Sequence, residues 1–393
     1  MPLTRAGGWD PSPGACGTWE RPVATRHLAR WRWHLKTAVA STIAHAFDHG
    51  LSVLARSPQR PLVLGYHRVV EEFEASATGE MPSMLTSARM FERHLDWIGR
   101  HFQFVTLDEI GERIAAGRPF DRPSAAVTFD DGYRDVYEHA FPVLRRKGIP
   151  AGVFVVTDLV GQPFWQVHDR LYHLVAKAFA RWHDPSRELI GVLRALEIPA
   201  GWLARSRSAT RSPLLAVSSL LPQLPLADVR RVMDRLETEV GNGFHDIPRT
   251  LNWTELAEMR DAGIAIGSHT RSHVSLPAET PAEIAGQLEG SRRTLEQRLG
   301  QTITHFAYPG GQFTPAVVDA VARAGYRFAY TACPHGDPRH PALTIERLLL
   351  WQGSSVDASG RFSPAILNCQ AHNLWPPARR CGRVHVEGQA AHG

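Results

Sequence analysis

The stretch AAVTFDDGY, residues 125–133, constrains the fold of this chain more than any other. An apolar, β-favouring run ends there in two adjacent carboxylates, Asp130 and Asp131, and a glycine. This pattern is typical of a buried strand that delivers acidic side chains to the rim of a parallel sheet, where such folds keep their chemistry. Two neighbouring carboxylates repel each other, so a site that keeps both ionised usually holds a cation, with one as ligand and the other as base. The alternative is that Asp-Gly is ordinary turn chemistry after a strand.

Composition places the chain among globular proteins and excludes several classes. Its 393 residues, 43% of them apolar, are enough for one large core or two modest ones. The net charge of +5 is small for this length and no basic run dominates the centre, so we expect no nucleic-acid partner. An anionic glycan or membrane surface stays open as a partner. The four cysteines are too scattered for a disulfide scaffold or a cysteine-built metal site.

The segment 1–57 is predicted to combine a flexible stretch with an amphipathic helix. Residues 1–25 are rich in Gly, Pro and small polar residues. Within residues 28–54, apolar side chains recur at helical spacing among basic ones, which indicates a helix packed on the domain or, alternatively, a peripheral membrane contact. A signal peptide is less consistent with this long, mixed leader, and no stretch has the ~18 apolar residues of a membrane span. We expect the protein to be cytoplasmic or peripheral to the inner membrane, with the periplasm as the remaining alternative.

Strands alternate with helices along most of the chain. Apolar runs begin at residues 62, 102, 124, 151, 263, 303, 328 and 343. Right-handed crossovers make such repeats a parallel sheet, and seven or eight units can close into a barrel. We therefore predict an α/β fold, a distorted (β/α)7-8 barrel. An open doubly wound sheet is the competing topology, but no glycine-rich nucleotide-binding turn follows the first strand.

The alternation lapses between about residues 163 and 250, where apolar spacing is helical and no strand is evident. We predict a helical insertion that frames a binding groove or serves as a plain spacer. The barrel domain is expected to span residues 58–370. The tail, residues 371–393, is rich in Pro, Gly and Arg and is expected to be flexible.

Two further motifs follow predicted strands at the same end as the acidic pair. His269 and His273 are four residues apart, so one helical turn would place both imidazoles on one face. With Asp131 they would form a two-histidine, one-carboxylate set that suits Zn²⁺ and also Co²⁺, Mn²⁺ or Fe²⁺. The sequence YPGG, residues 308–311, would let backbone N–H groups face a developing oxyanion, although it also fits a simple turn.

The three motifs TFDDG, SHTRSH and FAYPG, in this order, resemble those of the polysaccharide deacetylases of carbohydrate esterase family 4, the group with the nodulation-type deacetylase domain. The resemblance covers roughly residues 60–350. It implies a distorted barrel and metal-dependent removal of acetyl groups from N-acetylhexosamine units of a glycan. It implies these roles: Asp130 as catalytic base, Asp131, His269 and His273 as metal ligands, and the Gly310 amide as an oxyanion donor.

The chain departs from the family pattern in three places. Gly310 stands where many members carry a bulky aromatic residue after the proline. Ala307 stands where many members carry an arginine, so another cation must orient the base. Arg347, near the end of the last strand, is the candidate. The alternative is that Arg347 forms only a salt bridge on the surface. No clear match exists for the late motif that holds the general acid, for which His372 and His67 are candidates. The predicted function is glycan N-deacetylation in surface or exported polysaccharide biosynthesis. The alternatives are hydrolysis of a non-sugar amide on the same barrel and a catalytically silent glycan-binding accessory.

Overall fold

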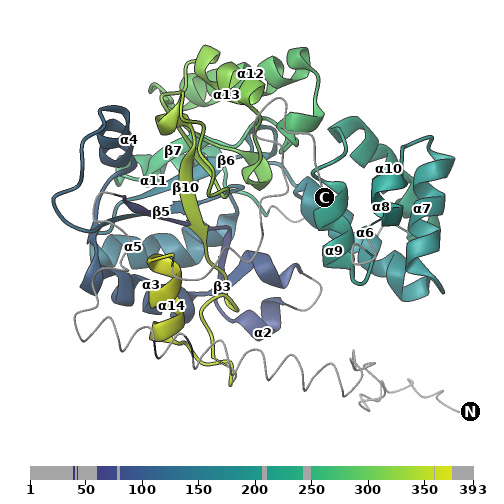
Figure 1. Cartoon of the computed structure of the whole chain (residues 1–393), viewed down its shortest axis with the longest axis horizontal. Helices are drawn as coiled ribbons and strands as arrows, with labels where there is room; N and C mark the ends of the chain where they lie inside the picture. The colour runs from purple at the N-terminus through teal and green to yellow at the C-terminus, as the bar shows by residue number, and fades with distance from the viewer. Residues whose placement is uncertain are drawn as a thin grey trace, which may run out of the picture.

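The computed structural model describes residues 39, 42, 60–77, 80–205, 210–241, 249–357 and 359–373. At its centre is a closed parallel barrel, which confirms the predicted fold class (Figure 1). Its strands are β1 (Leu62–Tyr66), β5 (Ser124–Phe129), β6 (Ala151–Val155), β7 (Ala265–Ser268), β8 (His305–Ala307), β9 (Phe328–Thr331) and β10 (Ile345–Leu349). They follow chain order around the ring, and β1 closes it by pairing with both β10 and β5.

The strand predicted at residue 102 is not one of the strands that form the closed barrel. It forms β4 (Gln103–Phe104), which pairs only with the first residues of β5, outside the ring. The segment predicted as a polar loop after β1 contains a separate two-stranded parallel sheet of β2 (Arg68–Val70) and β3 (Leu85–Ser87), with the short helix α2 (Phe73–Ser76) between them. These strands are only three residues long, too short to show a clear period in the sequence.

Helices cover the outside of the barrel because the strands are apolar on both faces. They are α3 (Ala88–His101), α5 (Phe141–Lys147), α11 (Trp253–Asp261), α12 (Pro281–Leu299) and α13 (Pro315–Arg323). Helix α4 (Leu107–Ala115) packs instead with the strand residues of the opposite face, since its Leu107 and Ile110 cluster with Val63, Ala126 and Phe154. The starts of these helices are set by side-chain caps: Thr106, Thr280 and Thr314 accept from the third helical N–H, and Asn252 forms the predicted capping box with Glu255. A last helix, α14 (Pro364–Ala371), lies in a stretch for which no helix was predicted.

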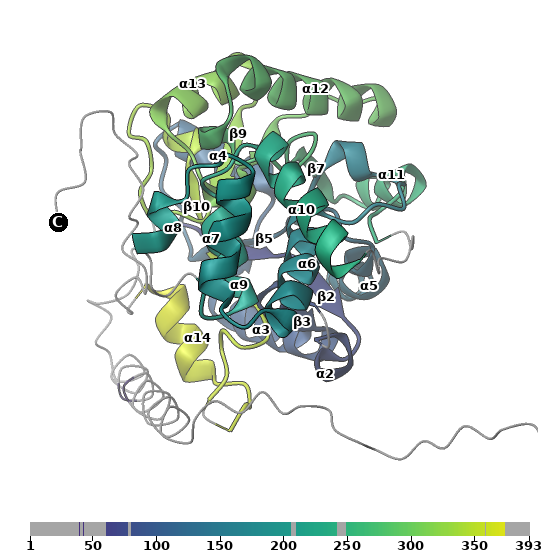
Figure 2. The ribbon, with the colours of Figure 1, turned by 90° about the vertical axis from the view of Figure 1, so that its right-hand side faces the viewer.

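The predicted helical insertion consists of α6 (Val167–Arg181), α7 (Pro185–Ala195), α8 (Gly201–Arg205), α9 (Pro213–Leu220) and α10 (Leu226–Val240). These helices pack around an apolar core of their own, distinct from that of the barrel. Figure 1 shows them as a group beside the barrel, and Figure 2 looks onto this group with the strands behind it. The insertion is therefore a second packing unit, joined to the barrel where α6 begins and where the chain returns to α11.

The two ends of the chain carry predictions that the structure does not address. The N-terminal segment 1–57, with its amphipathic helix and the membrane contact through residues 28–54, lies outside the described residues apart from Val39 and Thr42. The tail does so as well, apart from residues 371–373. Among the helices that are described, none has the length and apolar content needed to cross a membrane.

Candidate metal centre and catalytic carboxylate

The barrel topology brings the predicted chemical groups to one rim. Asp130 and Asp131 follow β5, His269 follows β7, and the turn containing Gly310 follows β8. Since all ring strands run parallel, their carboxyl ends meet at the same rim. The acidic pair, the histidines and the glycine turn therefore share one site, although they are up to about 180 residues apart in the sequence.

Asp131 lies at the centre of the candidate metal centre. Its side chain is fully buried, and its Oδ1 lies 3.5 Å from His269 Nε2 and 3.2 Å from His273 Nε2. Burial alone would raise the pKa of this carboxyl, but the neighbouring imidazoles of His168 and His273 outweigh burial and hold it below its ordinary value. Asp131 is therefore ionised, as a metal ligand must be.

His269 is oriented for ligation by a hydrogen bond on its far side. Its Nδ1 lies 2.8 Å from the backbone oxygen of Ala307, which only accepts, so Nδ1 carries the proton and Nε2 faces Asp131 with its lone pair. Burial lowers the pKa of His269 to about 4, which keeps the ring neutral at physiological pH. This backbone partner is the support typical of metal-binding histidines.

His273 reaches the same place through a turn rather than the helical turn considered from the sequence. Thr270 and His273 both have positive φ, at 67° and 57°, so the segment between them folds sharply. The Thr270 hydroxyl accepts from the His273 N–H at 2.9 Å, and Gln287 Oε1 accepts from the N–H groups of Arg271 and Ser272. The spacing of four residues therefore does bring both imidazoles to Asp131, but through this hydrogen-bonded turn and not through a turn of helix.

The residues present fit a divalent cation. Within the described part of the chain, neither oxygen of Asp131 accepts a well-aligned hydrogen bond, although both are buried. A buried carboxylate without such partners is costly, and a cation held with imidazole nitrogens at these separations would satisfy it. Nitrogen and oxygen donors of this kind suit Zn²⁺ and other first-row divalent ions.

His168, from α6 of the insertion, is a member of the cluster that the sequence did not reveal. Its Nε2 lies 3.6 Å from Asp131 Oδ2, and one ligand atom from each of Asp131, His168 and His273 lies within 4.8 Å of the others. The sequence around it shows only helical spacing, with a His-Asp pair at the start of the helix. No signal there could have linked it to a site that β5 and β7 build.

Asp130, the predicted base, points to a different partner. Arg347 on β10 binds it through two parallel hydrogen bonds of 2.7 Å, and Arg347 Nη1 also lies 3.2 Å from Thr128 Oγ1. Burial would raise the pKa of Asp130, but the Arg347 guanidinium outweighs it and holds the pKa below its ordinary value. Arg347 is only 4% exposed, so the alternative of a surface salt bridge is wrong. Arg347 therefore contacts the predicted base directly, as expected of the cation that orients it.

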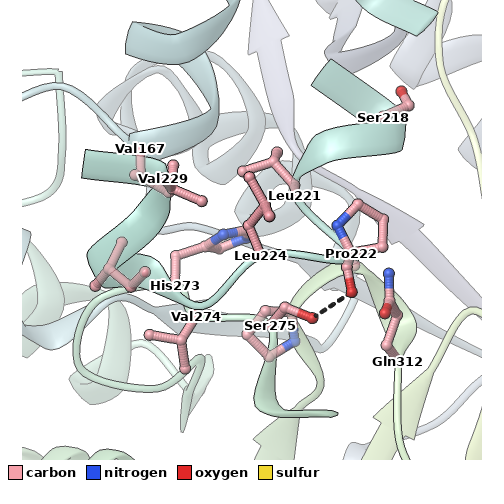
Figure 3. A pocket seen from close by; sticks show the side chains of 13 residues that line it. Val167, Ser218, Leu221, Pro222, Leu224, Val229, His273, Val274, Ser275 and Gln312 are labelled. Atoms are coloured by element: carbon pink, nitrogen blue, oxygen red, sulfur yellow. Dashed lines mark hydrogen bonds between the residues drawn. The ribbon is translucent and has the colours of Figure 1, made fainter. Parts of the chain in front are cut away.

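Gly310 lies in the turn Pro309–Gly311 that follows β8, with a φ of 60° that favours glycine. Together with His273 it lines a cavity of about 200 Å³ between the barrel and the insertion. Leu221, Leu224 and Val229 form the apolar wall of this cavity on the insertion side, and Figure 3 shows these side chains and His273 around the cavity. The cavity therefore opens beside the candidate metal centre.

The two candidates for the general acid differ in position. His372 ends α14, where its Nδ1 lies 3.0 Å from the Asn368 carbonyl and its ring contacts Phe102. Phe102 precedes β4, which pairs with the amino end of β5, opposite to the end that carries Asp130. The assignment of His372 to the site is therefore wrong. His67 directly follows β1 and stands at the same rim as Asp130.

The structure is a parallel barrel with an acidic pair and two histidines at its rim, and a family comparison identifies the class of protein to which it belongs. The model of the polysaccharide deacetylase family matches residues 117–329, more than half of the chain. The chain therefore belongs to the polysaccharide deacetylase family.

Similar proteins are known among bacteria. The chain is 19% identical over 317 residues to a putative polysaccharide deacetylase, YxkH, of Bacillus subtilis (strain 168), covering 80% of each chain. It is 31% identical over 128 residues to the poly-beta-1,6-N-acetyl-D-glucosamine N-deacetylase of Staphylococcus aureus (strain MSSA476), covering 30% of this chain and 44% of that protein. The match thus spans less than half the length of the staphylococcal enzyme. In fold, the chain resembles the Streptococcus pyogenes deacetylase PplD in complex with acetate, with a TM-score of 0.50, 16% identity, and coverage of 80% of this chain and 99% of that one.

Proposed function

We propose that the protein is a divalent-cation-dependent N-deacetylase that removes acetyl groups from N-acetylhexosamine units of a glycan, as a hydrolase of carbon-nitrogen bonds. The observation that carries the proposal is that two adjacent carboxylates have different partners. Asp131 lies among imidazole nitrogens, whereas both oxygens of Asp130 are bound by the Arg347 guanidinium. One carboxylate is thus placed to bind a cation and the other to accept a proton.

Asp131, His269 and His273 would hold the cation, for which Zn²⁺ is our first choice and Co²⁺, Mn²⁺ and Fe²⁺ are the alternatives. When bound, the cation would polarise the acetamide carbonyl and acidify a water molecule. Asp130 accepts the proton of the attacking water, and Arg347 keeps this base ionised and fixes its plane. We propose that the Gly310 amide donates to the oxyanion that forms at the acetyl carbonyl.

The cavity beside His273 supports a sugar as the substrate. Its leucine and valine wall suits the apolar face of a pyranose ring, while Ser218, Ser275 and Gln312 offer polar groups to the hydroxyls. The activity named for the staphylococcal relative, on a β-1,6-linked N-acetylglucosamine polymer, supports the same class of substrate. We propose a surface or exported polysaccharide as the natural substrate.

Filling this cavity is expected to weaken substrate binding. In Leu224→Trp, the larger ring would occupy space beside His273, and we expect KM for N-acetylglucosamine oligomers to rise by about tenfold or more, because even one misplaced group in a binding pocket costs ~1–3 kcal/mol. Steady-state kinetics with acetate detection measure this. The matched control is Leu215→Trp on α9, which is partly exposed and does not line the cavity. Equal KM values for the two variants would remove the cavity from the substrate site.

The proposed activity is tested by acetate release from a panel of compounds. The full chain is incubated with N-acetylglucosamine oligomers of increasing length and with non-sugar acetamides. Release from the oligomers in preference to the other amides supports the proposal. Preference for non-sugar amides would indicate the other hydrolase, and oligomer binding with no release in the presence of Zn²⁺ would indicate a silent accessory protein.

A further inference from the structure

The metal-ligand turn has a backbone conformation that needs support from outside. Asp131 and Gly132 adopt left-handed φ values of 69° and 68° in succession. The left-handed region costs a non-glycine residue roughly 1 kcal/mol, and such strain persists only where the surroundings enforce it. At Gly132 a Cβ would lie 2.8 Å from Val155 Cγ1, so this position also demands glycine. The groups that hold this turn therefore decide where the Asp131 carboxylate points.

Those groups come from the two ends of the helical insertion. The side-chain amide of Gln166, the residue before α6, donates to the backbone oxygen of Asp131 at 2.7 Å, and Gln166 is only 1% exposed. From the other end of the insertion, the Leu251 N–H donates to the Gly132 oxygen at 2.9 Å. Arg134, two residues after Gly132, donates its backbone N–H to the backbone oxygen of Arg249 at 2.8 Å.

A buried side-chain network joins the same two parts. The Tyr133 hydroxyl donates to Asp169 Oδ2 at 2.7 Å, so its oxygen accepts from His168 Nε2 at 2.8 Å. The same nitrogen lies 3.6 Å from Asp131 Oδ2. Tyr133, His168 and Asp169 are all buried, so these polar contacts are shielded from water and depend on correct packing of α6.

We propose that the helical insertion positions the metal ligand Asp131, with Gln166 as the principal positioning residue. This inference rests on the proposed function, because it assigns a role toward the cation that Asp131 would bind. The insertion is then more than a wall of the substrate cavity. Its two ends close on the turn from Asp131 to Arg134, and the affinity of the site for a cation depends on this closure.

The test compares two glutamines that make the same kind of bond. Gln166→Met keeps the length of the side chain and removes the donor to the Asp131 oxygen. Gln370→Met is the matched control, since Gln370 on α14 donates to the Ser354 oxygen at 2.9 Å, a bond that does not involve the turn from Asp131 to Arg134. Zn²⁺ affinity of the metal-free full chain is measured by competition with a chromophoric chelator, and thermal unfolding of the same samples reports stability.

We expect Gln166→Met to weaken Zn²⁺ binding by ~10- to 100-fold, as outer-shell changes do, while Gln370→Met loses comparable stability and keeps its affinity. Gln166→Asn, which keeps the amide but shortens its reach, is expected to fall between, and it is read by the same criterion if the methionine variant does not fold. Unchanged Zn²⁺ affinity in both Gln166 variants, with lowered stability, would overturn this inference but leave the proposed function standing. A wild-type chain that binds no divalent cation would overturn the proposed function as well.

Discussion

Asp130→Asn is expected to lower kcat for acetate release by ~100- to 10,000-fold, the range attributed to a positioned general base. The amide has nearly the same shape but cannot accept the proton of the attacking water. Zn²⁺ affinity is expected to change little. Both oxygens of Asp130 are bound to Arg347, and Asp130 does not belong to the group of ligand atoms from Asp131, His168 and His273. Single-turnover acetate release and a chelator competition assay measure the two quantities on the same samples.

The matched control for this variant is Asp135→Asn. Asp135 is also an aspartate of the segment after β5 and also pairs with an arginine, since its Oδ2 accepts from Arg68 Nε at 2.7 Å. Its replacement removes a shielded ion pair without touching the proposed base. If both variants lost activity to the same degree, or if Asp130→Asn released acetate at the wild-type rate, Asp130 would not be the base.

Arg347→Met is expected to destabilise the protein by about 3–5 kcal/mol, because it leaves the Asp130 carboxylate buried and unpaired. Without the guanidinium, burial dominates and raises the pKa of Asp130. The acidic limb of the activity profile should then move to higher pH, since a larger share of Asp130 is protonated at a given pH. Chemical denaturation and the pH dependence of kcat measure both effects.

The pH dependence of this stabilisation has a definite sign. The pair with Arg347 lowers the folded-state pKa of Asp130, so its contribution is present above the unfolded-state pKa and is lost as the pH falls through the folded-state pKa. Arg327→Met is the surface control: Arg327 and its partner Glu112 are both about half exposed, so its loss should cost only about 0–1 kcal/mol. Equal losses for the two variants, with an unshifted pH profile, would contradict the role given to Arg347.

The barrel and its reactive rim could be predicted because strand periodicity and chain topology determine both. Each ring strand is a short apolar run, and parallel strands place the residues after β5, β7 and β8 at one rim. Arg347 could be proposed for the same reason, as the end of the last strand returns beside β1. Its bidentate contact with Asp130 depends on side-chain conformations that no sequence pattern specifies.

The remaining parts of the site depend on tertiary packing. Gln166 and His168 belong to a helical segment whose pattern reports only its own apolar core, so their contact with the Asp131 turn left no trace in the sequence. His372 was misplaced because a histidine late in the chain gives no indication of which end of the barrel it will occupy. The short strands β2 and β3 were missed because three residues are too few to reveal alternation.

The most direct test of the central claim is acetate release from an N-acetylglucosamine oligomer by the full chain as purified, after removal of metal by a chelator, and after return of Zn²⁺. We predict that metal removal lowers release to below about 1% of the starting rate and that Zn²⁺ restores it, because the cation would activate both the water and the carbonyl. Release that continues at the original rate from a chain shown by elemental analysis to be free of metal would contradict the account.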